Sequence, residues 1–146
     1  MKSLVLAAHI VCASAWLGCV LTEAVFEHSI GPEWVNRRFV ARLHWLTDCW
    51  VEVPLIAGVL ITGFVLSATS QFTPALAVKI AFGLSAIVLN AVCVVLVKRR
   101  LAHADAGEAE GYERVDRWQH RIGAGVLAGI VGALATGGLR FAAVVA

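Results

Sequence analysis

Ionisable side chains occur inside the apolar stretches of this 146-residue sequence, and their types could support proton or metal chemistry. They are His9, Glu23, His44, Asp48, Glu52, Lys79 and His120. Charged groups are costly in hydrocarbon and usually face the interior of a helix bundle, where they pair or meet water. Glu52 lies near the middle of its apolar stretch, too deep for its short side chain to reach water. We expect its carboxyl group to be protonated, paired or beside water.

Helical spacing, at about 100° per residue, places these groups on one face of each predicted helix. The faces contain His9, Cys12, Trp16 and Glu23 on the first helix, and His44, Asp48 and Glu52 on the second. His9 and Lys79 each lie near the same end of their helices, so they could meet there. His44 and His120 have a similar depth near the opposite end and could form a second pair.

These residue types suggest a cofactor or metal site, but each of them also has a purely structural interpretation. A neutral imidazole facing a bundle interior is a suitable axial ligand for haem iron, and bundle cores commonly hold cofactor sites. Glu23 and Asp48 could instead pair with arginines near the membrane surface, because long arginine side chains reach the interface. Cys12 and Cys19 are interpreted as small packing residues, or as ligands if the protein handles copper.

Four apolar segments must position these residues. The chain is 60% hydrophobic and only 15% charged, whereas soluble domains average about 45–50% and 25%. The length excludes a large two-domain enzyme. Helices of about 20 apolar residues can cross a bilayer, and residues 4–26, 39–67, 74–97 and 122–146 qualify. The sequence therefore predicts one all-α domain, residues 1–146, folded as an integral membrane four-helix bundle with up-down-up-down topology.

The distribution of Lys and Arg predicts the orientation, because cytoplasmic loops are enriched in these residues. Nine of the twelve basic residues fall at one end of the predicted bundle. They are Arg37, Arg38, Arg42, Lys98, Arg99, Arg100, Arg114, Arg117 and Arg121. We expect segments 29–38 and 98–121 to be cytoplasmic loops and both termini to lie outside, as in a bacterial inner membrane. The net charge of +2 gives no indication of a nucleic-acid partner.

Short motifs in the first three segments resemble those of a group of small membrane proteins. The first helix reads His9-Ile-Val-Cys-Ala-Ser-Ala-Trp16-Leu-Gly18, the second has Pro54 followed by Thr62-Gly63, and the third has Lys79 near its start. The pattern is similar to the copper-resistance D domain, the four-helix oxygen-independent protoporphyrinogen IX oxidases and an uncharacterised family of similar length. The resemblance to the oxidases implies that His9 and Lys79 take part in haem b binding.

The leading functional hypothesis is a haem b membrane redox protein, an oxidoreductase if it is an enzyme. It would pass electrons between a quinone or porphyrinogen and a partner redox subunit or second copy. Glu52, Glu23 and Asp48 would carry protons; His9, Lys79, His44, His120 and Trp16 would line the cofactor site. One alternative is copper or other metal transport through Cys12, Cys19, His9 and Glu52. Another is a membrane anchor without a cofactor.

Overall fold

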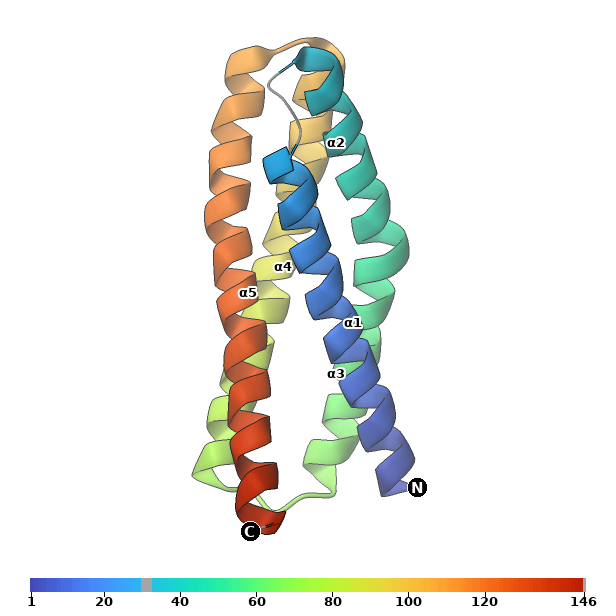
Figure 1. Ribbon diagram of the computed structural model, residues 1–146, viewed down its shortest axis with the longest axis vertical. Helices are drawn as coiled ribbons and strands as arrows, with labels where there is room; N and C mark the ends of the chain where they lie inside the picture. The colour runs from blue at the N-terminus through green and yellow to red at the C-terminus, as the bar shows by residue number, and fades with distance from the viewer. Residues whose placement is uncertain (30–32, 146) are drawn as a thin grey trace.

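The computed structural model describes residues 1–29 and 33–145, with side chains up to residue 138. Every element in these ranges is helical. The elements are α1 (Lys2–Ser29), α2 (Trp34–Thr47), η1 (Asp48–Glu52), α3 (Val53–Ala68), α4 (Pro74–Ala106) and α5 (Ala109–Val145). Because α2, η1 and α3 are continuous, the chain forms four long helices. In Figure 1 the start of α1 and the end of α5 lie at the same end of the molecule.

The four helices are long and apolar enough to cross a membrane, which confirms the predicted all-α membrane-type chain. Large apolar side chains are exposed on their outer surfaces, for example Leu4, Trp50, Phe64 and Val88. A soluble monomer rarely exposes so much apolar surface. The exterior therefore suits contact with lipid.

The prediction of a loop over residues 98–121 is wrong, because this segment is helical apart from one tight turn. The helix α4 continues to Ala106 and α5 begins at Ala109. The segment is rich in Arg, Ala and Glu, which are strong helix formers, so its polarity does not prevent helix formation. Gly107 ends α4 with a φ of 75°, a conformation that favours glycine. Both helices consequently extend well beyond the apolar spans.

The expected loop over 29–38 is also shorter than predicted, since α2 begins at Trp34. Residues 30–32 of that loop, and residue 146 of the expected fourth span, lie outside the described residues. The long helical ends carry their own small core. In it, Ala41 of α2 packs with Ala104 of α4 and Tyr112 of α5.

A π-helical turn, η1, interrupts the second long helix at Asp48–Glu52. The N–H of Val53 donates to the carbonyl of Asp48, five residues earlier. Pro54 follows directly; proline has no N–H and its ring crowds the carbonyl four residues before it, so a wider turn relieves the clash. Such turns are frequent at functional sites. Here the turn holds two acidic residues, Asp48 and Glu52, both buried in the bundle.

The apolar core lies between the helices at mid-length, where α4 and α5 are in close contact. Its buried residues are Trp16, Ile56, Ala86, Cys93, Val126 and Ile130. A Cβ atom at Gly129 would lie 2.8 Å from the Cβ of Ala86 and 3.1 Å from the backbone oxygen of Phe82. Small residues allow such backbone approach in membrane bundles.

Substitution Gly129→Ala should therefore destabilise the bundle by about 1–3 kcal/mol, because α4 and α5 must separate. The matched control is Gly123→Ala on the same helix, where a Cβ meets nothing within 4 Å. The control should be neutral or slightly stabilising, since alanine is the better helix former. Denaturant unfolding in mixed micelles measures both. Equal stability of the two variants would contradict the close packing.

Candidate functional site

A fully buried arginine organises the polar residues at the α2–α4–α5 end of the bundle. Arg100 of α4 is 0% exposed and forms a two-pronged ion pair with Glu27 of α1. Its Nη1 donates to Glu27 Oε2 at 2.8 Å and to Asp116 Oδ1 at 2.7 Å, and its Nη2 donates to Glu27 Oε1. The guanidinium also lies 5.7 Å from the centre of the Tyr112 ring. Planar bidentate pairing of this kind fixes the carboxylate geometry.

His44 connects this ion pair to a second group of carboxylates. Its Nδ1 lies 2.8 Å from Glu27 Oε1, the oxygen to which Arg100 also donates. Its Nε2 lies 3.2 Å from Glu23 Oε2 and 3.8 Å from Asp48 Oδ1. Both ring nitrogens of His44 thus face carboxylates contributed by α1 and η1.

The π-helical turn adds two carboxyl groups that have little polar support. Asp48 is 1% exposed and Glu52 is 2% exposed. The amide of Asn90 donates to Glu52 Oε2 at 3.1 Å. Asp48 Oδ2, Glu52 Oε1 and Glu23 Oε1 are buried, and the described residues offer them no hydrogen-bond partner. Glu52 adjoins the other carboxylates through Glu23, because one oxygen of each lies within 4.8 Å of the other.

The carboxylates of this cluster outnumber its buried cations. Arg100 balances Glu27, while Asp116 is partly exposed. Among the described residues, Glu23 and Asp48 then face the imidazole of His44, and Glu52 faces the neutral amide of Asn90. Unbalanced buried charge is strongly unfavourable in an apolar environment. The cluster is therefore arranged to take up positive charge, either as protons or as a metal cation.

His9 and Lys79 lie in a separate place, about 20 Å along α1 from Glu23 at the helical rise per residue. His9 Nδ1 lies 2.9 Å from Thr62 Oγ1, and this hydroxyl donates to the carbonyl of Gly58. Because its one hydrogen is used there, the hydroxyl accepts from Nδ1–H, which leaves the Nε2 lone pair for another partner. Lys79 is close enough for its charge to act on the ring.

The other predicted site residues are divided between packing and the cluster. Trp16 is buried in the apolar core, and the described residues offer its Nε1 no acceptor. Cys12 packs where Gly58 leaves space for its Sγ. The Sγ of Cys19 forms a compact group with one oxygen each of Glu23 and Glu52. Cys12 and Cys19 therefore belong to different surroundings.

His120 lies beside the cluster but is not buried in it. Its side chain is 53% exposed, its Nδ1 lies 2.8 Å from the Asp116 carbonyl and its Nε2 lies 4.0 Å from Glu27 Oε2. His44 and His120 thus approach opposite oxygens of Glu27. The expected pairing of these histidines around a haem is not favoured, since the described carboxylates occupy both nitrogens of His44.

Arg100 and Gln119 belong to the cluster but were not predicted. Gln119 is buried, and its amide nitrogen lies 3.3 Å from His44 Nδ1. The third predicted span ends at residue 97, and its buried face in the structure includes Asn90 and Cys93. Continuing this face by helical steps of three and four residues reaches Val97, Arg100 and Ala104, all of which are buried. The periodicity of this helix therefore indicates an inward position for Arg100 once the helix is extended past residue 97.

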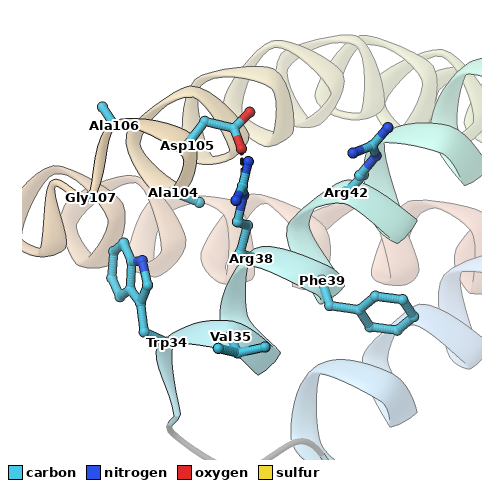
Figure 2. A pocket seen from close by; sticks show the side chains of 9 residues that line it. All are labelled: Trp34, Val35, Arg38, Phe39, Arg42, Ala104, Asp105, Ala106 and Gly107. Atoms are coloured by element: carbon cyan, nitrogen blue, oxygen red, sulfur yellow. Dashed lines mark hydrogen bonds and ion pairs between the residues drawn. The ribbon is translucent and has the colours of Figure 1, made fainter.

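A pocket of about 540 Å³ opens near the turn between α4 and α5 (Figure 2). The side chains of Trp34, Arg38 and Phe39 line it from α2, while Asp105 lies on α4. Arg38 pairs with Asp105 at 2.6 Å across the pocket. None of the predicted site residues lines it. The pocket therefore belongs to the helical ends rather than to the buried cluster.

Comparison with known proteins gives no family for this chain: no family model, curated protein or solved structure matches it.

Substitution Arg100→Met should destabilise the protein by about 3–5 kcal/mol, because it leaves Glu27 without its buried counter-charge. The matched control, Arg38→Gln, breaks an exposed ion pair and should cost less than about 1 kcal/mol. Adding Glu27→Gln to Arg100→Met should restore part of the lost stability. Denaturant unfolding in mixed micelles measures all three. If Arg100→Met alone lowers the free energy of unfolding no more than Arg38→Gln does, the ion pair of Arg100 is not buried in solution.

Proposed function

We propose that this chain is an integral membrane protein with an up-down-up-down bundle and both termini outside, in a bacterial inner membrane. The four long apolar helices support the membrane location. The positive-inside tendency supports the orientation, since basic residues such as Arg37, Arg42 and Lys98 gather toward the α2–α4–α5 end. That end, including the turn at Gly107, would face the cytoplasm.

We further propose that the bundle carries protons in support of electron transfer by a haem b. The observation that carries this proposal is the excess of buried carboxyl groups at Glu23, Asp48 and Glu52 over the cations that face them. Protons are the simplest charges that can neutralise such an excess. Glu52 adjoins Glu23, and Glu23 and Asp48 both lead through His44 toward Glu27.

The donor groups at the His9 end support a haem there. Haem b would supply one-electron chemistry when bound. The donor set is an imidazole whose Nε2 lone pair is available and an amine on a different helix, and His9 and Lys79 would hold the group. Thr62 would fix the His9 tautomer through Nδ1, as hydrogen-bond partners commonly do for ligating histidines. Electrons would pass between a quinone or porphyrinogen and a partner subunit or second copy.

Substitution His9→Ala should remove the haem absorption bands from the purified protein, because it deletes the imidazole ligand. His103→Ala is the matched control, since that histidine pairs with Glu108 at the surface. Oxidised and dithionite-reduced spectra after expression with haem supplied give the measurement. A colourless wild-type protein, or a His9→Ala spectrum identical to that of wild type, would exclude this haem site.

Proton coupling predicts that the midpoint potential of the loaded protein falls as pH rises, by up to about 59 mV per pH unit for one proton per electron. Substitution Glu52→Gln should flatten this dependence, because the amide cannot take up the proton. Glu113→Gln, at an exposed ion pair with Arg37, should leave it unchanged. A redox titration over a range of pH tests this. The same slope in Glu52→Gln and wild type would exclude Glu52 as a proton carrier.

Copper transport is a second candidate, favoured by Cys19 beside Glu23 and Glu52. Cys12 does not join that group; it lies seven positions before Cys19 on the same helix, about 10 Å away along the axis. A single ion could not contact both thiols. The membrane-anchor alternative is less favoured, because a simple anchor does not need buried carboxyl groups. It does not explain why Glu52 and Asp48 are buried at a cost in folding free energy.

A further inference from the structure

The cluster around His44 has the form of a metal site rather than of a simple ion-pair network. One oxygen each of Glu23 and Asp48 and one nitrogen of His44 all lie within 4.8 Å of one another. His44 Nε2 is 3.2 Å from Glu23 Oε2 and 3.8 Å from Asp48 Oδ1. Ligands of a tetrahedral zinc ion at 2.0–2.1 Å are separated by roughly 3.3 Å. Small side-chain movements would therefore bring these three atoms into a coordination sphere.

The groups that surround these atoms also match a metal site. In such sites a ligating histidine commonly donates its other ring N–H to a carboxylate, which fixes the tautomer and orients the ring. Here His44 Nδ1 lies 2.8 Å from Glu27 Oε1, and Arg100 holds Glu27 in place. His44 Nε2 is then left to face Glu23 and Asp48. The ion pair of Glu27 with Arg100 thus orients His44, the nitrogen ligand of this group.

Buried oxygens without partners supply a second, independent indication. Asp48 Oδ2 and Glu23 Oε1 have no hydrogen-bond partner among the described residues. The amide oxygen of Gln119 has none there either, although the amide nitrogen of the same side chain lies 3.3 Å from His44 Nδ1. All three residues are more than nine-tenths buried. Buried polar atoms are nearly always satisfied, so such a concentration of free acceptors needs an explanation. A cation bound through both oxygens of each carboxylate would satisfy these free atoms together with the oxygens that face His44.

The balance of charge favours a divalent ion. With Glu27 paired to Arg100, the carboxylates of Glu23, Asp48 and Glu52 remain. His44 must be neutral to bind a metal, so the three carboxylates carry a charge of −3. A dication reduces this net charge to −1. The Sγ of Cys19 lies within 4.8 Å of one oxygen each of Glu23 and Glu52, and it adds a soft ligand atom to the group. Nitrogen, carboxylate and thiol donors together suit zinc or ferrous iron rather than magnesium or calcium.

We propose that Glu23, His44 and Asp48 bind a divalent first-row transition metal cation, with Glu52 and Cys19 completing its surroundings. The binding itself is simple: carboxylate and imidazole lone pairs coordinate the ion, and any protons on these groups pass to solvent. This inference goes beyond the proposed function, because it needs neither haem nor electron transfer, although it uses some of the same carboxyl groups.

Metal binding to the full-length protein in detergent, with Zn²⁺ and Co²⁺ as probes, tests the proposal. After removal of metals with a chelator and dialysis against Zn²⁺, wild type should retain about one ion per chain by elemental analysis. His44→Gln and Asp48→Asn should each weaken binding at least tenfold. Glu113→Gln, which alters an exposed carboxylate, should bind as wild type does. With Co²⁺, wild type should show visible absorption bands of low-symmetry coordination that the two ligand variants lack.

Further variants separate this site from folding defects and from the haem proposal. If His44→Gln or Asp48→Asn does not yield folded protein, Glu23→Gln replaces it and carries the same expectation. Cys19→Ser should alter the Co²⁺ spectrum while Zn²⁺ is retained. His9→Ala should retain Zn²⁺ whether or not it binds haem, so the two proposals can fail independently. Folded wild type that binds no Zn²⁺, or Zn²⁺ bound equally by wild type and all ligand variants, would overturn the inference.

Discussion

The ion pair between Arg100 and Glu27 is the interaction on which the polar interior depends. An arginine that is 0% exposed cannot lose its charge, so its position requires carboxylates on facing helices. Glu27 from α1 and Asp116 from α5 supply them, and Glu27 in turn orients His44. The pair therefore ties α1, α2, α4 and α5 together at one end. Removing one partner costs more than the pair contributes, because the remaining charge stays buried.

Two local features of the backbone bring the cluster together. The helices α4 and α5 continue past the apolar spans to the turn at Gly107, which places Arg100 inside the bundle instead of in a loop. The π-helical turn before Pro54 carries Asp48 and Glu52. The separation of this cluster from His9, about 20 Å along α1, leaves room for proton and cation chemistry at one end and a cofactor at the other.

Much of the fold follows from hydropathy, because four apolar stretches of sufficient length can only be helices in a bilayer. The inward positions of Glu23, Asp48 and Glu52 follow from helical spacing, and these residues do come together. The site of Arg100 was missed, since polarity was read as a loop although the residues there are good helix formers. The partners of His44 depend on side chains from three helices, and periodicity along one helix does not determine them.

The central claim is that the buried carboxyl groups exceed their counter-cations and that protons or a metal ion make up the difference. The most direct measurement counts the protons released when Zn²⁺ binds the purified protein in weakly buffered solution near pH 7. Protonated carboxyl groups in the cluster should give saturable release of about one to two protons per bound ion, with much less release in Glu52→Gln. Binding of Zn²⁺ without proton release, or the same release from wild type and Glu52→Gln, would contradict it.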